Sequence, residues 1–211
     1  MDVSSYPTTW HEVDALALEN ETLRVVVVPR MGGKIVSLLD RRTQIEWLVA
    51  PEGRPFEPVP YRAPFSGQDM SGWDEMFPTI EACAYPASGE YEGTPLPDHG
   101  EVWALPWTVE ASGAGQIVLS VEGRALPYRL TRTLDFSAPD TLRLAYQLAN
   151  TGPERMPTIW AAHPQFDCGA SAEIILPEHV DRVCNTTSEE WGWGAPETEY
   201  DWPQAIDPGG H

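Results

Sequence analysis

The sequence predicts an all-β protein, a large sandwich or barrel built from many short antiparallel strands. Two segments in the second half of the chain alternate apolar and polar residues with a period of two, which is typical of half-buried strands. No segment repeats its apolar residues with the period of 3.6 that marks an amphipathic helix. The chain also carries 21 prolines among 211 residues, and proline breaks helices and is confined to sheet edges and loops.

The N-terminal part of the chain is predicted to form a meander of short antiparallel strands. The expected strands cover residues 13–18, 22–28, 34–39 and 44–49. The second of them is a run of β-branched residues, which is typical of a buried strand, and Pro29 ends it. Gly32 and Gly33 follow as a flexible corner, because glycine takes positive φ without steric cost.

Residues 51–98 are rich in proline and glycine and are predicted to form a long loop. A loop of this length without regular structure is uncommon in a compact domain and is usually functional. It contains the sequence SGWDEMFP (residues 71–78), which places aromatic and acidic side chains together. Two interpretations remain open for each of these side chains: the aromatic rings plug the edge of the core, or they line a site.

Strands are expected again beyond Trp107, and the chain then changes character. The expected strands cover residues 116–121, 128–136, 141–148, 157–162 and 173–176. The strand over 128–136 has one apolar face, on which Arg132 is the exception. We expect one domain over residues 1–187, followed over residues 188–211 by an acidic, tryptophan-rich loop or tail.

Composition and charge exclude several classes of function. The formal net charge is −19, from 32 acidic and 13 basic residues, so nucleic acid and anionic membranes are not expected partners. No apolar run approaches the roughly 20 residues that span a bilayer, and the N-terminus has no signal-peptide pattern. Three cysteines without CxxC spacing predict neither disulfides nor a zinc knuckle, which favours a reducing, cytoplasmic location.

The common cofactor motifs are absent from the sequence. It has no phosphate-binding loop, no dinucleotide-binding fingerprint and no nucleophile elbow. The three histidines His99, His163 and His179 lie far apart in sequence and lack carboxylates at the spacing that a metal site favours. We therefore expect neither a metal nor a cofactor.

Two histidines are the candidate functional residues. His99 lies in the sequence DHGEVWALPW (residues 98–107), where Asp98 can raise its pKa and fix its tautomer. His163 ends the apolar segment 159–162 just before a proline. The simpler interpretation is a solvated His99 and a His163 that only caps the sheet. The interpretation that we develop is that both histidines face one pocket.

Tryptophans near these histidines point to a carbohydrate as the small-molecule partner. A sugar offers C–H faces for stacking and hydroxyl groups for hydrogen bonds, so a sugar site combines aromatic walls with a few placed polar groups. The available walls are Trp73, Trp103, Trp107 and Trp160. Asp74, Glu75 and Glu101 are the acidic side chains expected to bind hydroxyl groups.

Several segments in succession resemble the galactose mutarotase-like superfamily, in particular relatives of aldose 1-epimerase. They are residues 18–23 (LENETL), 29–35 (PRMGGKI), 73–78 (WDEMFP), 98–103 (DHGEVW), 150–152 (NTG) and 163–166 (HPQF). Each motif is short and degenerate, and their order and approximate distances over residues 16–185 carry the resemblance.

The resemblance implies an antiparallel β-supersandwich that binds a sugar in a cleft and interconverts its α and β anomers by opening the ring. In this family a carboxylate takes the proton of the anomeric hydroxyl and a histidine protonates the ring oxygen. The match assigns the acid role to His163 and a binding and polarising role to His99.

The chain departs from the family pattern at two positions. The arginine of the family's early Asn-Arg pair is missing, and Arg62 substitutes for it by position only. The family's catalytic glutamate lies beyond the segment that matches, so the chain is either a shortened member or a fragment. Glu75, Glu101 and Glu178 remain open as alternative bases. The expected strands are also fewer than a complete supersandwich needs, so sheet edges are left open to pair with another chain.

Three hypotheses for the function follow. The first is an aldose 1-epimerase-like enzyme, and the second is a non-catalytic carbohydrate-binding or sensor domain that lacks the catalytic carboxylate. The third is a β-sandwich of unrelated function, because fold alone does not fix function. The identity of the sugar, its phosphorylation and the oligomeric state stay open.

Overall fold

The structure is a computed structural model, and it describes residues 1–51, 53, 56–169, 172–186 and 194–202. The chain divides into two compact units, Met1–Cys168 and Gly169–His211, which are described separately. Regular structure in the described residues consists of strands and two single turns of 3-10 helix, so the all-β prediction is confirmed. None of these residues forms a helix long and apolar enough to cross a membrane.

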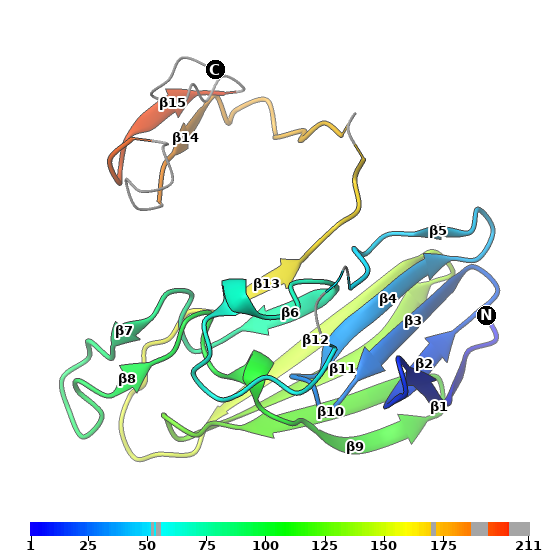
Figure 1. The fold of residues 1–211 in the computed structure, drawn as a ribbon, viewed down its shortest axis with the longest axis horizontal. Helices are drawn as coiled ribbons and strands as arrows, with labels where there is room; N and C mark the ends of the chain where they lie inside the picture. The colour runs from blue at the N-terminus through cyan, green and yellow to red at the C-terminus, as the bar shows by residue number, and fades with distance from the viewer. Residues whose placement is uncertain (52, 54–55, 170–171, 187–193, 203–211) are drawn as a thin grey trace. The chain divides into compact units, whose positions relative to one another are not determined.

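The first unit contains two large antiparallel sheets (Figure 1). Seven strands form one sheet in the order β1-β2-β3-β4-β6-β13, with β5 paired to β4. Their bounds are β1 (Ser4–Trp10), β2 (Val13–Glu19), β3 (Leu23–Val28), β4 (Lys34–Asp40), β5 (Ile45–Glu46), β6 (Trp73–Met76) and β13 (Ala161–Pro164). Strand β6 therefore joins the N-terminal meander to β13, the strand that carries the second candidate histidine.

The second large sheet has four strands in the order β12-β11-β10-β9. Their bounds are β9 (Thr108–Gly113), β10 (Gln116–Glu122), β11 (Tyr128–Ala138) and β12 (Thr141–Asn150). Smaller elements complete the first unit: the pair β7 (Cys83–Ala84) and β8 (Pro95–Leu96), and the 3-10 turns η1 (Phe65–Gly67) and η2 (Val102–Ala104). Strands β12 and β13 stand at the ends of their sheets, so each leaves one edge unpaired among the described residues.

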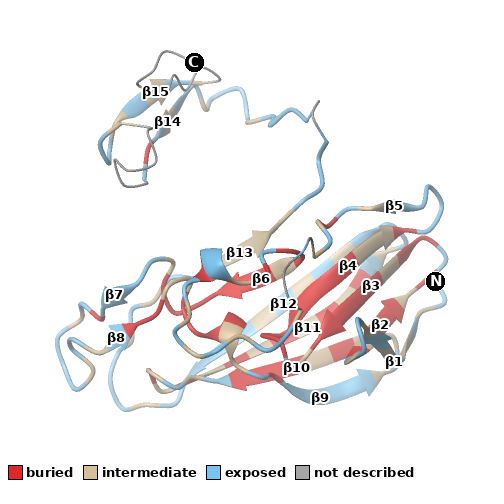
Figure 2. Ribbon diagram, in the orientation of Figure 1, coloured by how far each residue is buried: buried red, intermediate tan, exposed pale blue. Residues whose placement is uncertain are grey.

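The main hydrophobic core lies between the two sheets. Val25, Val27 and Ile35 of the first sheet pack with Ile117 and Leu134 of the second in one buried cluster. Figure 2 shows this burial concentrated in the central strands, whereas β9 and β12 are exposed along much of their length. We call the face of the seven-stranded sheet that is turned toward the second sheet its inner face, and the opposite face its outer face.

The outer face of the seven-stranded sheet is also largely covered. A second buried cluster gathers the residues that alternate with the inner set: Ala15, Ala17, Val26, Val28, Met31 and Val36. Because successive side chains of a strand point to opposite faces, a sheet buried on both faces gives continuous apolar runs. This explains the uninterrupted run of four valines, 25–28, in β3.

The strongest sequence patterns predicted the strands well. The expected strands at 13–18, 22–28, 34–39, 116–121, 128–136 and 141–148 are confirmed within two residues at each end. The strand expected over 44–49 shortens to β5, and the one expected over 157–162 begins only at Ala161. The strand expected over 173–176 is wrong: those residues pair with no strand among the described residues, and Ile175 is 85% exposed.

Three strands of the large sheets were not predicted, and each has a physical reason. Strands β1 and β9 lie at sheet ends, so they remain half-exposed and show no apolar alternation. Strand β6 lies inside the segment predicted to be a long loop, because its sequence WDEM carries two adjacent acids. Both acids are nevertheless buried, and the ion pairs that permit this burial come from other parts of the chain.

The second unit contains one antiparallel pair among its described residues, β14 (Arg182–Cys184) with β15 (Glu199–Asp201). Of the tail expected over residues 188–211, positions 188–193 and 203–211 lie outside the described residues.

Candidate functional site

The two candidate histidines lie against each other in the folded chain. Their ring centroids are 5.0 Å apart and the rings are nearly perpendicular. Phe65 of η1 stacks flat on His99 at 4.1 Å and meets His163 edge-on at 5.0 Å. We call His99, His163 and Phe65 the histidine cluster. Sequence reasoning did not find Phe65, since a single aromatic residue in a proline-rich segment carries no distinctive signal.

A tight backbone turn places His99 in this cluster. His99 and Gly100 both have positive φ, 59° and 70°. A Cβ atom on Gly100 would lie 2.2 Å from the carbonyl oxygen of Phe77. The backbone N–H groups of His99 and Glu101 donate to the carbonyl groups of Ile80 and Phe77, at 2.8 Å each. Only glycine fits at position 100, so the His-Gly pair of the sequence is the turn that presents His99.

Asp98 fixes the orientation of His99. Its Oδ1 lies 2.9 Å from Nδ1 of His99, and its Oδ2 accepts the backbone N–H of Phe65 at 3.0 Å. Burial acts to raise the pKa of Asp98, but the hydrogen bonds from Phe65 and His99 outweigh it and lower that pKa. An ionised carboxylate only accepts hydrogen bonds, so Nδ1 of His99 carries a proton and Nε2 is the nitrogen left for other partners.

Trp103 stabilises this turn through hydrogen bonds from its indole. Its Nε1–H donates to the carbonyl groups of Asp98 and Gly100 at 3.1 and 3.0 Å. The indole is buried and meets Phe65 edge-on at 5.1 Å. Trp103, which was predicted to form a wall of the sugar site, therefore lies beside the histidine cluster as a buried support of the turn.

His163 reaches the cluster from β13. It lies directly opposite Asp74 of β6 in the strand register, and residues directly opposite in an antiparallel pair project from the same face. Partial burial, followed by the nearby His99 and Lys34, lowers the pKa of His163. The ring is therefore held mainly neutral near neutral pH, and it is a stronger acid when protonated than a free imidazole.

The lowered pKa of His163 gives a prediction for stability. Between the pKa of His163 in the folded protein and its higher value in the unfolded chain, the unfolded state binds more protons. We therefore expect the free energy of unfolding to fall as the pH decreases through this window, which lies below the ordinary imidazole pKa of about 6.5. Urea unfolding of wild type and His163→Gln at several pH values between 8 and 5 measures the effect. The variant should lose less stability over this range, and equal losses would contradict the prediction.

Glu75 lies on the inner face and is fully buried. Its carboxylate accepts hydrogen bonds from Nη1 of Arg132 at 2.9 Å, the hydroxyl of Tyr146 at 2.6 Å and Nε1 of Trp160 at 2.9 Å. Burial and the Glu75 charge raise the pKa of Tyr146, which keeps that hydroxyl a donor. Glu75 and Trp160 were predicted to bind substrate, and the structure instead places both on the side of β6 opposite the histidine cluster.

Trp73 also projects from β6 toward the inner face. Its ring meets Phe166 edge-on at 6.2 Å. It contributes, with Trp47, Leu142, Leu144 and Phe166, to an apolar cavity of about 530 Å³ between the sheets. Trp73 was predicted to stack on substrate beside the histidines, and its alternation with Asp74 places it on the opposite face of the strand.

Glu101 is the second buried carboxylate of the predicted site. It accepts the hydroxyls of Tyr61 and Tyr128 at 2.7 and 2.9 Å, and the backbone N–H groups of Arg124 and Ala125. Burial, together with the hydrogen bond to Glu101 and its charge, raises the pKa of Tyr61 to about 12. This carboxylate has its lone pairs occupied and ties three segments of the chain together. The geometry supports a structural role for it.

None of the interactions described in the first unit joins Arg62 or Trp107 to the histidine cluster. Arg62 is exposed and lies 5.6 Å from the ring centroid of Tyr61. Glu178, one of the alternative bases, belongs to the second unit and is exposed there. Trp107 is buried, donates to the carbonyl of Val102 at 2.9 Å, and lies beneath the guanidinium group of Arg132.

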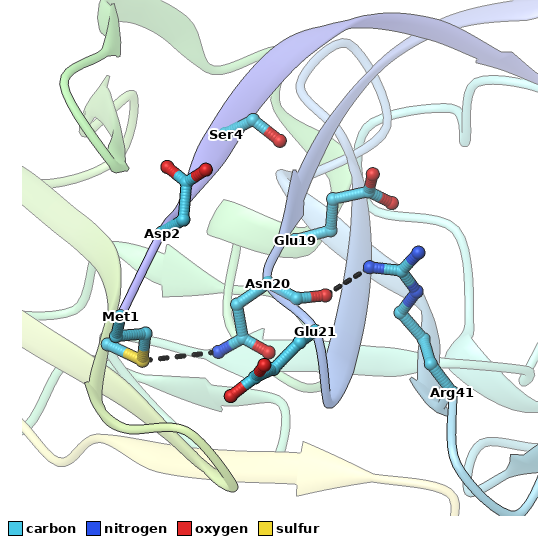
Figure 3. Close-up of a pocket in the computed structure, with 7 residues that line it drawn as sticks. All are labelled: Met1, Asp2, Ser4, Glu19, Asn20, Glu21 and Arg41. Carbon is cyan, nitrogen blue, oxygen red and sulfur yellow. Dashed lines mark hydrogen bonds between the residues drawn. The ribbon is translucent and has the colours of Figure 1, made fainter.

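A polar cavity of about 470 Å³ lies elsewhere, where the N-terminus meets the β2–β3 turn (Figure 3). It is lined by Met1, Asp2, Ser4, Glu19, Asn20, Glu21 and Arg41. Asn20 caps the turn by accepting the N–H groups of Thr22 and Leu23, and its amide nitrogen donates to the carbonyl of Pro139. The side-chain amide of Asn20 is thus occupied by the turn and by Pro139, and this cavity has no residue in common with the histidine cluster. Nowhere in the described residues do three or more metal-ligating side chains gather as a metal site would require.

The chain is similar in fold to several solved structures. A galactose mutarotase-like protein from Clostridium acetobutylicum matches 79% of this chain and 55% of its own, with 16% identity and a TM-score of 0.65. One from Lactobacillus casei matches 75% and 51%, with 17% identity and a TM-score of 0.59. A galactose mutarotase related enzyme from Lactobacillus acidophilus matches 74% and 50%, with 15% identity and a TM-score of 0.56.

The chain spans about half the length of these structures. The sequence matches no protein-family model and no curated protein. At this level of identity the similarity concerns the arrangement of the strands. Together, the antiparallel sheets and these neighbours show that the chain has the galactose mutarotase-like fold.

Proposed function

We propose that this protein binds an aldose at the histidine cluster and interconverts its α and β anomers. The observation that carries the proposal is the direct contact of His99 and His163, two residues 64 positions apart in sequence, on the outer face of the seven-stranded sheet. The fold neighbours named for galactose mutarotase support the choice of a sugar as substrate.

The chemistry of mutarotation needs two proton-handling groups close together. A base removes the proton of the anomeric hydroxyl while an acid protonates the ring oxygen, so that the ring opens and recloses on the other face of the carbonyl. His99, with Asp98 bonded to Nδ1, presents a basic Nε2. His163 acts as the acid from its protonated form, because its lowered pKa makes that form a stronger proton donor to the ring oxygen.

A second function, sugar binding without turnover, is favoured by a different observation. Glu75 and Glu101, two of the alternative bases, are fully buried and engaged in hydrogen bonds. Neither of these two glutamates is therefore free to act as the base. If His99 does not take the proton of the anomeric hydroxyl in their place, the protein binds the sugar and leaves its anomers unchanged.

Mutarotation of freshly dissolved α-glucose and α-galactose, followed by polarimetry or by NMR, tests the proposal. We expect wild type to accelerate the reaction above the buffer rate. His163→Gln should lower kcat by about 10²-fold, which is the lower end of what a well-placed general acid contributes. His11→Gln is the matched control, since His11 is exposed in the β1–β2 turn and should leave the rate unchanged.

Two other outcomes decide between the hypotheses. If wild type matches the buffer rate while either sugar perturbs the imidazole signals of His99 and His163, the protein binds without turnover. If neither the rate nor these signals respond to millimolar sugar, both sugar functions are contradicted.

A further inference from the structure

One buried carboxylate on the outer face has an oxygen that the fold does not use. Asp74 is 1% exposed. Its Oδ2 pairs with Nζ of Lys34 at 2.8 Å. Its Oδ1 is buried and has no hydrogen-bond partner among the described residues. Leaving a buried acceptor unpaired costs about 1–3 kcal/mol, so an orphan of this kind points to a partner that appears in another state of the site.

The neighbouring Asp69 shows what a purely structural carboxylate looks like in the same network. Asp69 also lies near Nζ of Lys34, at 3.4 Å. Its two oxygens accept the backbone N–H and the hydroxyl of Ser71, at 3.2 and 2.9 Å. Lys34 in turn donates to the carbonyl groups of Asp69 and Ser71. This lysine is therefore held by the 69–71 turn even without Asp74, so Asp74 is not needed to fix it.

The strand register brings Asp74 next to His163. The two residues are directly opposite in the β6–β13 pair, and such residues have Cβ atoms about 4.5–5.5 Å apart on one face of the sheet. Other charged or polar groups near the His163 ring are Lys34 from β4, His99 from the turn before η2, and Gln165, whose Nε2 lies 3.4 Å from Nδ1 and 3.5 Å from Nε2 of the ring. None of these three groups is a carboxylate, whereas Asp74 is one and projects from the same face on the adjacent strand.

We propose that Asp74 is a positioning residue for His163, and that its free Oδ1 accepts an N–H of the His163 ring when that ring is protonated. The inference rests on the proposed function, in which His163 is the acid. Lys34 balances the Asp74 charge, so the carboxylate can stay ionised while buried.

In the reaction the proton moves in one step. The imidazolium of His163 holds one N–H toward Asp74 and gives the other proton to the ring oxygen of the sugar. One N–H bond breaks, one O–H bond forms, and the ring is left neutral with its remaining N–H on the Asp74 side. Burial raises the pKa of Asp74, which makes its carboxylate a stronger hydrogen-bond acceptor than an exposed one.

The isosteric variant Asp74→Asn tests the proposal, with Asp69→Asn as the matched control. NMR titration of the imidazole signals, with His163→Gln to assign them, should show a lower pKa for His163 in Asp74→Asn and no change in Asp69→Asn. The kcat of mutarotation should fall by about ten- to hundredfold in Asp74→Asn, the effect of one charge-assisted hydrogen bond on a rate. KM should change little, because Asp74 is buried and is proposed to act through His163.

The outcomes separate this inference from the proposed function. An unchanged His163 titration in Asp74→Asn overturns the inference even if wild type is an active mutarotase. A lowered His163 pKa in a protein without mutarotase activity supports the positioning of His163 and contradicts the proposed function. If Asp74→Asn does not fold, the carboxyl carbon signal of Asp74 in wild type decides: it should show a step at the pKa of His163, and its absence overturns the inference.

Discussion

Arg132→Met is expected to lower the free energy of unfolding by about 3–5 kcal/mol, the cost of leaving a buried charge without its partner. Arg132 and Glu75 are both fully buried and lie 2.9 Å apart between the two sheets. The guanidinium group also donates to the carbonyl of Gly33 and lies 5.0 Å from the ring centroid of Trp107. Methionine fills a similar volume without a charge, so the loss measures the isolated Glu75 carboxylate more than a cavity.

Urea denaturation of three further variants makes this test specific. Arg143→Met removes an exposed ion pair with Asp135 and should cost only about 0–1 kcal/mol. The double variant Glu75→Met/Arg132→Met should be more stable than Arg132→Met alone, because no charge is then stranded in the core. If Arg132→Met costs no more than Arg143→Met, or if the double variant is the least stable of the set, the pair is not buried as described.

This pair also shows how far the sequence alone predicted the fold. The alternation in β11 correctly placed residue 132 on the apolar face, where an arginine looked like an exception. The acids of β6 looked like loop residues, so that strand was missed. Each anomaly explains the other, because Glu75 and Arg132 neutralise one another across the core. A pairing between residues 57 positions apart leaves no local pattern, so periodicity cannot reveal it.

The sequence also predicted only part of the candidate site. The two histidines were predicted to share one region, and the structure brings their rings to 5.0 Å. The acids were harder to place, since adjacent residues of a strand point to opposite faces. Asp74 and Glu75 are consecutive in β6, so Asp74 lies beside His163 while Glu75 points into the core between the sheets. The sequence of β6 alone does not indicate which of its two faces is turned toward the second sheet.

Glu101 poses a sharper problem, because in sequence it stands two residues after His99. In a site built from that stretch it would serve as a base, and its replacement by glutamine would abolish activity while leaving the fold intact. The structure indicates the opposite role. We expect Glu101→Gln to lower the free energy of unfolding by about 2–3 kcal/mol, since an amide cannot replace both oxygens of this carboxylate.

The hydrogen bonds of Glu101 explain this expectation. Its Oε1 accepts the N–H of Arg124 at 2.9 Å, and the N–H of Ala125 is shared between Oε2 at 2.9 Å and Oε1 at 3.2 Å. Either orientation of a glutamine amide turns its NH₂ group toward one of these backbone donors. The hydroxyls of Tyr61 and Tyr128 can rotate to accept a hydrogen bond, but a backbone N–H cannot. With the amide oxygen at the Oε2 position the N–H of Arg124 loses its partner, and with the oxygen at Oε1 the N–H of Ala125 keeps only its longer bond of 3.2 Å and faces the NH₂ group.

Glu110→Gln is the matched control for Glu101→Gln, because Glu110 is partly exposed and bonds to Ser120 and Arg129 at the sheet surface. It should change the free energy of unfolding by less than about 1 kcal/mol. Urea denaturation and the mutarotation rate are measured on the same samples. If Glu101→Gln keeps wild-type stability and loses activity, Glu101 belongs to the catalytic machinery. If it loses stability while the folded fraction keeps its rate, the carboxylate holds the loop that presents His99, and the proton chemistry belongs to the histidines.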